Sequence, residues 1–276
     1  MCHNKTQKYA KSKKELCKTK VEFRAGTFFE NSKLSIFQIL GFVNLWVDAV
    51  PLKVICCQLE IDRSAAVNWS SFCREVVLDA FIANPMKLGG PGKIVEIDES
   101  KFGKRKYHRG HHVEGQWVFG GYERGSGRVF MIAVEKRDAN TLIPIIQQWI
   151  EPGTTIISDF WKAYDCLNLA GFKHLKVNHS LHFKDPETGA HTNAIESSWR
   201  AAKASMSPSG RRKAHIPGNL ARYMFFKKCK DEEINKTIDF FKLAGRLYPG
   251  KKKEKILENV PLDFSELSDE DIFDGD

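Results

Sequence analysis

The sequence lacks an uninterrupted apolar run long enough to cross a membrane. Its most apolar stretch, residues 34–57, is broken by polar side chains and a proline: Gln38, Asn44, Asp48, Pro51 and Lys53. A membrane-spanning helix needs about 20 consecutive apolar residues. We therefore expect a buried helix in this stretch, and no membrane among the partners.

The sequence also lacks the marks of a secreted disulfide scaffold. Its seven cysteines are an odd number without scaffold spacing, and no signal peptide opens it, so we expect a reducing compartment. The glycine-rich segment 120–127 has no Lys-Ser or Lys-Thr after it, which argues against a nucleotide-binding loop.

Positive charge is what the sequence has in excess. The formal net charge is +9 and the pI about 9.1, which favours a polyanionic partner. Residues 1–24 hold seven Lys and one Arg against two Glu, whereas residues 262–276 carry seven acids and no base. Two hypotheses stay open for this acidic tail: a solvated segment, or a mimic of nucleic acid that restrains the basic surface.

The chain divides into three predicted regions: a basic, helical region 1–90, a mixed region 91–230, and a C-terminal helix with the acidic tail, 231–276. In the first region, residues 58–81 predict two helices with a turn at Ile61–Asp62. The predicted inward-facing residues are Ala65, Val67, Trp69, Phe72 and Val76. This pattern fits a DNA-binding helix-turn-helix or a plain helical hairpin, and the sequence leaves both open.

The middle region predicts an α/β fold. Strands are expected at 93–98, 116–123, 128–135, 154–159 and 173–178, and helices at 139–150, at 161–171 and from Asn193, with Asp138 or Asn140 as the cap of the first helix. Three antiparallel strands followed by alternating helices and strands give a mixed sheet flanked by helices.

Three acids are candidates for a shared site. Asp98 and Asp159 each close a predicted strand, and neighbouring strands would bring their carboxylates together at the carboxyl edge of the sheet. Glu196, on the flank of a predicted helix, is the candidate third acid. The alternative for Glu196 is a capping box with Asn193, in which the glutamate only satisfies backbone donors.

Three such carboxylates suit metal-assisted chemistry. Close carboxylates repel each other unless a cation or a proton lies between them. Hard oxygen ligands favour Mg²⁺, and two ions about 3.5–4 Å apart can activate an attacking oxygen and stabilise a leaving oxygen in phosphoryl transfer. The pattern therefore predicts a phosphoryl-transfer enzyme.

A longer run of motifs resembles the Merlin-type DDE transposases and their ISXO-like insertion-sequence relatives. The resemblance covers residues 93–205, through "VEIDESKFGKRKYHRG", "GQWVFGGYERGSGRVF", "LIPIIQQWIEPGTTIISDFWKAYDCL", "VNHSLHF" and "DPETGAHTNAIESSWRAAKA". It implies a ribonuclease H-like catalytic domain with Asp98, Asp159 and Glu196 at the DDE positions, as catalytic residues and as ligands of two Mg²⁺ or Mn²⁺ ions.

The resemblance further implies a DNA transposase. Its partners would be double-stranded DNA, namely transposon terminal inverted repeats and target DNA, and further copies of the chain in a homo-oligomer. Its compartment would be the nucleus in a eukaryote and otherwise the cytoplasm, at the nucleoid. The alternative is a domesticated relative that binds DNA without catalysis.

One departure concerns the N-terminus. Relatives often carry a zinc ribbon that ends in a Cys-x-x-Cys pair, but here that place is Cys17-Lys18-Thr19-Lys20, and upstream only Cys2 and His3 could contribute ligands. A structural zinc site needs four ligands. We expect a degenerate ribbon without zinc.

Basic side chains on both sides of the acids are the predicted DNA contacts. For the basic residues that follow Asp98, from Lys101 to Arg109, the alternative is a solvated, charged hairpin. The predicted contacts are Lys101, Lys104, Arg105, Lys106, Arg109, Arg200, Lys203, Arg211 and Arg212.

Overall fold

The computed structural model describes residues 23–103, 115–159, 161, 164–177, 191–207 and 209–250. Several predictions fall outside these residues: Lys104, Arg105, Lys106 and Arg109, the zinc-ribbon residues Cys2, His3 and Cys17, and the acidic tail. Within the described part, no helix is long and apolar enough to cross a membrane.

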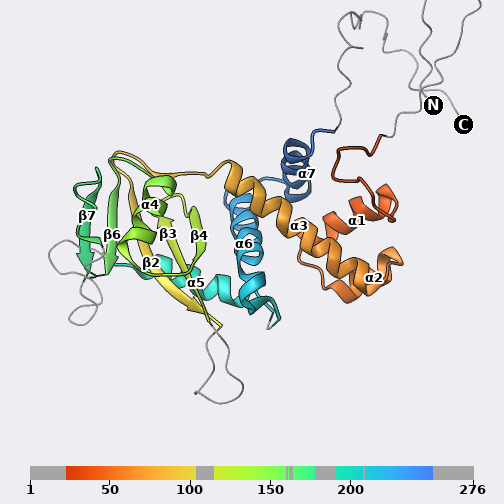
Figure 1. Ribbon diagram of the computed structural model, residues 1–276, viewed down its shortest axis with the longest axis horizontal. Helices are drawn as coiled ribbons and strands as arrows, with labels where there is room; N and C mark the ends of the chain where they lie inside the picture. The colour runs from red at the N-terminus through yellow and green to blue at the C-terminus, as the bar shows by residue number, and fades with distance from the viewer. Residues whose placement is uncertain are drawn as a thin grey trace, which may run out of the picture.

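A five-stranded mixed sheet forms one lobe of the molecule (Figure 1). Its strands are β2 (Ile94–Phe102), β3 (Gln116–Glu123), β4 (Val129–Val134), β6 (Thr155–Asp159) and β7 (Lys173–Val177). The spatial order is β4-β3-β2-β6-β7. The first three strands are antiparallel to their neighbours, and β6 and β7 then continue parallel to β2. This order, a meander followed by two parallel strands, is the ribonuclease H-like arrangement.

The predicted hairpin and its following helix are confirmed. Gly125 and Gly127 have φ of 86° and 73° in the turn between β3 and β4, a conformation that glycine adopts without steric cost. Helix α4 (Ala139–Trp149) begins at Asp138, whose carboxylate accepts a hydrogen bond from Thr141 N at 2.9 Å. The short strands β1 (Leu88–Gly89) and β5 (Ile150–Glu151) pair with each other beside the main sheet.

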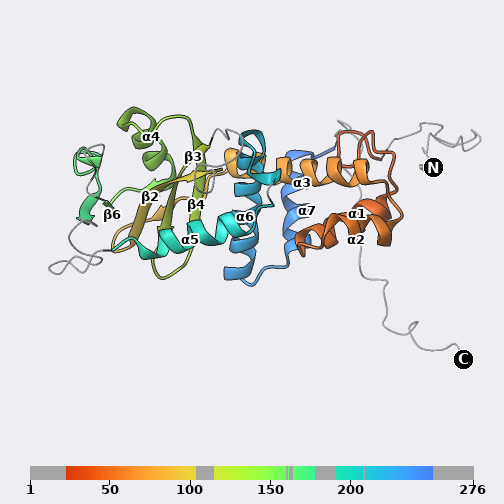
Figure 2. The ribbon, with the colours of Figure 1, turned by 90° about the horizontal axis from the view of Figure 1, so that it is seen from below.

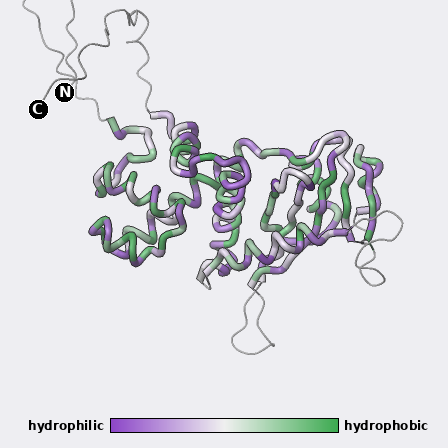
Figure 3. Tube along the Cα trace, turned by 180° about the vertical axis from the view of Figure 1, so that it is seen from behind, coloured by the Kyte–Doolittle hydropathy of each residue, from purple (hydrophilic) through white to green (hydrophobic). Residues whose placement is uncertain are grey.

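Two helices cover the sheet from opposite faces. Figure 2 shows α4 on one face and α5 (Asn193–Ala204) running along the other. Hydrophobic residues follow the strands between them (Figure 3). The buried face of α5 contains Ile195, Trp199 and Ala202, followed by Met206.

Helices form the second lobe (Figure 1). They are α1 (Ile36–Val47), α2 (Leu52–Leu59), α3 (Arg63–Ala83), α6 (Ile216–Asp231) and α7 (Lys236–Leu247). The C-terminal helices α6 and α7 both pack against α3, and α6 also contacts β4. Segments from the two ends of the chain thus build this lobe together. Two short 3-10 helices, η3 (Ser209–Arg211) and η4 (Lys213–His215), connect α5 to α6.

The inward face predicted for α3 is confirmed at Trp69 and Val76, which are buried, and is wrong at Val67 and Phe72. Val67 and Phe72 are each 47% exposed, whereas the buried positions begin at Ala66 and include Ser70 and Cys73. These buried residues follow helical spacing, and their small side chains let neighbouring helices approach. The prediction therefore identified part of the buried face and missed its small residues.

The helix predicted at 161–171 is also wrong over its described part, 164–171. That segment forms turns closed by i to i+3 bonds, such as Leu167 N to Tyr164 O at 3.1 Å. The Asn168 side chain accepts a hydrogen bond from His174 N, which ties the segment to β7, and Gly171 has φ of 87°. Local side-chain bonding of this kind competes with the helical ladder.

Candidate active site

Asp98 lies where β2 leaves its parallel neighbour. The pairing of β2 with β6 ends with Glu96 opposite Ile157, so two residues further on Asp98 comes level with Asp159, the last residue of β6. The prediction that Asp98 closes its strand is wrong, since β2 continues to Phe102. Its antiparallel partner β3 sustains the pairing over these last residues.

Helix α5 runs alongside β2 and contacts it at regular intervals. Ala194 N lies 2.9 Å from Glu96 Oε2, Trp199 Nε1 donates to Asp98 Oδ2 at 3.0 Å, and Lys203 Nζ donates to Ser100 Oγ at 2.7 Å. Two strand residues advance about 6.6 Å, and four or five helical residues advance roughly 6–7.5 Å. The alternating side chains of one strand face therefore meet successive turns of the helix.

The start of α5 is held by Glu96, a fully buried carboxylate. Its Oε2 accepts hydrogen bonds from Ala194 N and Ile195 N, at 2.9 and 3.1 Å. Its Oε1 accepts from Arg124 Nε at 2.7 Å, and Arg124 also donates to His191 O just before the helix. An anion at this place satisfies free N–H groups and the positive end of the helix dipole.

The capping-box interpretation of Glu196 is therefore wrong. The N-cap residue is Thr192, it makes no side-chain capping bond, and the Asn193 Oδ1 atom has no hydrogen-bond partner in the described structure. Because Glu96 takes over the capping role, the Glu196 carboxylate is not needed to start its own helix.

Gly120 leaves the space into which the Trp199 side chain packs. It lies opposite Asp98 on β3, and a Cβ atom there would come within 2.5 Å of Trp199 Cη2 and 2.7 Å of Phe130 O. The missing side chain lets the indole lie against the sheet, where its N–H reaches Asp98. Glycine here is required by close packing rather than by backbone conformation.

Two acids at this edge, Asp98 and Glu99, have raised pKa values. Burial raises the pKa of Asp98 to about 6, with further contributions from the charges of Asp159 and Glu196, against the opposing Trp199 hydrogen bond. Burial, followed by the charges of Asp98 and Asp159, raises the pKa of Glu99 to about 8, although the Arg137 charge opposes this. Tyr164 Oη donates a hydrogen bond to Glu99.

The three predicted acids thus share one electrostatic neighbourhood, but they are not gathered into a ligand cluster. Glu196 is exposed in the first turn of α5. Among the described residues, no group of three or more His, Cys, Asp or Glu side chains is arranged so that it could hold a metal ion.

The described basic residues fall into two places. Lys203 reaches Ser100 and lies 5.0 Å from the Phe102 ring centre, while Arg211 donates to Lys203 O at 2.9 Å, and Arg200 and Arg212 are exposed. Lys101 points to the other face of β2, with its Nζ 5.5 Å from the Trp117 ring centre. The first group therefore extends along the helix that carries Glu196.

Glu96, Glu99 and Trp199 were not predicted as parts of the site. The segment "VEIDE" (95–99) contained a usable signal, because strand alternation puts Glu96 on the face of Asp98 and Glu99 on the opposite face. An acid in the middle of an apolar strand also needs a partner when it is buried. That partner could not be identified from the sequence, because it is the start of a helix almost 100 residues away.

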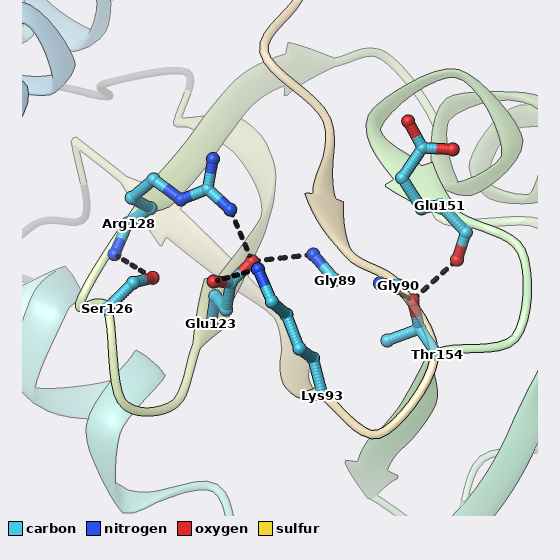
Figure 4. A network of polar contacts seen from close by, with 8 residues as sticks. All are labelled: Gly89, Gly90, Lys93, Glu123, Ser126, Arg128, Glu151 and Thr154. Carbon is cyan, nitrogen blue, oxygen red and sulfur yellow. Dashed lines mark hydrogen bonds and ion pairs between the residues drawn. The ribbon is translucent and has the colours of Figure 1, made fainter.

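At the other end of β3, Glu123 shows a different arrangement (Figure 4). It is almost fully buried, and its carboxylate accepts from Arg128 Nη2 at 2.7 Å and Gly89 N at 2.6 Å and lies 3.4 Å from Lys93 Nζ. Burial alone would raise the pKa of Glu123, but hydrogen bonds from Gly89, Ser126 and Arg128 bring it below its ordinary value. The network also attaches β1 to the main sheet.

Strand order, flanking helices and an acidic edge define the class of the mixed lobe, a ribonuclease H-like α/β domain. Residues 87–213 match the family model of the ISXO2-like transposase domain. This part of the chain is therefore similar to the insertion-sequence DDE transposases of that family. An uncharacterized transposase-like protein from Haemophilus influenzae is 28% identical over 120 residues, which cover 42% of this chain and 91% of the relative.

Solved structures of retroviral integrases share a more distant likeness. The catalytic core domain of BIV integrase is 14% identical with a TM-score of 0.31, covering 47% of this chain and 80% of that one. The HTLV-2 integrase catalytic core domain in complex with magnesium is 13% identical with a TM-score of 0.32, covering 49% and 84%. Because these scores are low, the fold assignment rests on the strand order.

Proposed function

We propose that this protein is a metal-dependent DNA transposase of the Merlin type, in which Asp98, Asp159 and Glu196 hold two Mg²⁺ or Mn²⁺ ions. The observation that carries the proposal is the strand register, which brings Asp98 of β2 level with Asp159 at the end of β6, beside the helix that carries Glu196. The charges of Asp159 and Glu196 both act on Asp98, and residues 87–213 match the ISXO2-like transposase domain. The substrate would be the DNA ends of a transposon and then a target duplex.

The donor set suits such ions. All three side chains are hard oxygen donors, and a divalent cation would offset both the burial and the mutual repulsion that raise the Asp98 pKa. When bound, the ions supply an activated attacking oxygen and stabilise the leaving oxygen. Since Glu196 is exposed, the proposal requires it to approach the two aspartates when metal and DNA bind.

The protein's own residues would position the reactants. Trp199 fixes the orientation of the Asp98 carboxylate through its hydrogen bond, and Glu96 fixes the start of the helix that presents Glu196. Arg200, Lys203, Arg211 and Arg212 follow Glu196 along and beyond α5, where DNA phosphates would lie. Pairing of two DNA ends would call for a homo-oligomer.

The test is cleavage and strand transfer on oligonucleotides that carry the element's inverted repeats, with Mg²⁺ or Mn²⁺. Asp98→Asn, Asp159→Asn and Glu196→Gln should each lower activity at least about 10³-fold, because each removes a charge that is needed in the transition state. Binding of the same DNA should survive in all three variants.

Glu151→Gln is the matched control, since it removes one carboxylate from an exposed position on β5 and should leave cleavage unchanged. Normal cleavage in any of the three variants would refute that residue's assignment. If the wild-type chain binds the DNA but never cleaves it, the domesticated, non-catalytic alternative is correct.

A further inference from the structure

A cavity of 240 Å³ lies outside the acidic edge, between the helical lobe and the end of α5. It is lined by Ala49, Ser205, Asn219, Arg222, Tyr223 and Phe226. Ser205 is the residue that ends α5, whereas the other side chains come from α6 and from the connection between α1 and α2. The two lobes therefore both contribute to its walls.

Arg222 in this wall is a half-buried cation with few partners. Its guanidinium lies between two aromatic rings, 5.2 Å from the Trp46 ring centre and 4.7 Å from that of Phe226. It makes one long hydrogen bond, Nη2 to Trp46 O at 3.5 Å, and within the described residues its buried Nε has no partner. A buried donor without an acceptor is costly, and a guanidinium has five donors to satisfy.

The surroundings add positive charge. Arg74 lies in the same cluster, since its Nη1 donates to Ser70 Oγ, which also accepts from Trp46 Nε1. Burial lowers the pKa of Arg222, and the Arg74 charge lowers it further. In the part of the chain that the structure describes, neither arginine forms an ion pair with an acid.

The neighbouring acid does not balance this charge. Asp48, adjacent to the lining residue Ala49, already pairs with Lys236 Nζ at 3.4 Å. That lysine lies 5.5 Å from the ring centre of Phe226, another lining residue. The cavity is thus lined by a guanidinium that has no ion-pair partner among the described residues, beside a local excess of positive charge, which is the composition of an anion site.

We infer that Arg222 and this cavity bind a phosphate of the DNA backbone, at a place separate from the proposed reaction site. The inference rests on the proposed function for the identity of the polymer. Glu196 and Ser205 are nine helical residues apart, about 13 Å along the axis of α5, and the two and a half turns between them put them on opposite flanks of the helix. The phosphate at Arg222 would therefore belong to a different part of the DNA from the one at the acidic edge.

A DNA-binding titration at several salt concentrations tests the inference on the full-length chain. Arg222→Gln should weaken binding of a duplex about tenfold and reduce the slope of log affinity against log salt by about one, as expected for one lost phosphate contact. Arg222→Lys keeps the charge and should retain the slope while losing part of the affinity. The control Lys242→Gln removes one exposed charge from α7 and should change neither quantity.

A second measurement uses inorganic phosphate as the probe. Phosphate at constant ionic strength should raise the melting temperature of the wild type and of Lys242→Gln, but not of Arg222→Gln. Loss of the phosphate effect together with the changed salt slope supports the inference. An unchanged salt slope overturns it, even if phosphate binding depends on Arg222, because the cavity would then hold a free anion only. Failure of cleavage alone, with these results intact, would count against the proposed catalysis and not against this site.

Discussion

Four acids on the neighbouring strands β2 and β3 differ in how their charge is compensated. Glu96 and Glu123 each face an arginine at 2.7 Å and accept hydrogen bonds from backbone N–H groups. Asp98 and Glu99 form no ion pair within the described residues. Their partners are the neutral side chains of Trp199 and Tyr164.

The difference separates two uses of a buried carboxylate. A compensated acid connects parts of the fold, as Glu96 does between β2 and α5, and as Glu123 does between β1 and the main sheet. An uncompensated acid is costly to ionise, and a fold that retains it leaves room for a cation from outside. Glu96 and Asp98 lie two residues apart on one strand face and differ in charge compensation. Substitutions at these two positions therefore test the difference most directly.

The largest effect on stability is expected from Glu96→Gln. It removes the charge that faces Arg124 and the start of α5, and breaking a buried pair of this kind costs about 3 kcal/mol of the free energy of unfolding. Urea denaturation measures the loss. DNA cleavage should fall as well, because the helix that carries Glu196 loses its capping partner.

Glu151→Gln provides the comparison for this variant. Glu151 is 48% exposed and lies 3.9 Å from Lys87 Nζ, so its loss should cost less than about 0.5 kcal/mol. Equal losses in the two variants would mean that the compensated role assigned to Glu96 is wrong.

The same acids show which features of the fold and the site could be predicted from the sequence and which could not. Strand alternation, the glycine turn after Glu123 and the Asp138 cap are local signals, and the structure confirms the hairpin and the start of α4. The end of β2 could not be predicted, because pairing with β3 determines it. The small residues on the buried face of α3 and the cap of α5 could not be predicted either, because the first meet other helices and the second is a contact between residues almost 100 positions apart.

The next effect concerns the uncompensated pair. Mg²⁺ should stabilise the wild-type chain by about 2.7 kcal/mol at a concentration 100 times its Kd, since an ion that binds only the folded state shifts unfolding by mass action. Asp98→Asn should abolish this Mg²⁺-dependent rise in melting temperature, while Glu151→Gln keeps it. A rise of the same size in Asp98→Asn would show that the ion binds elsewhere.

The next test is the pH dependence of stability that Glu99 contributes, measured by urea denaturation in buffer with a chelator. The folded-state pKa of about 8 lies above the ordinary value of 4.5, so the fold favours the protonated acid. Below pH 4.5 the group is protonated in both states and contributes nothing. As pH rises towards 8 the unfolded chain releases the proton first, and stability is lost. Glu99→Gln remains neutral and keeps an oxygen that can accept from Tyr164, so its advantage over the wild type should grow through this range.

Glu123 should show the opposite slope, which makes the pair of titrations a direct test of the contrast. Its folded-state pKa lies below the ordinary value, so its stabilising contribution is present above that value and is lost as pH falls through the folded-state pKa. Glu123→Gln should therefore be less stable than the wild type at neutral pH, and the gap should close on acidification. If the stability of both variants changes in the same direction with pH, Glu99 and Glu123 do not differ in charge compensation. The proposal of a cation site at the acidic edge would then be contradicted.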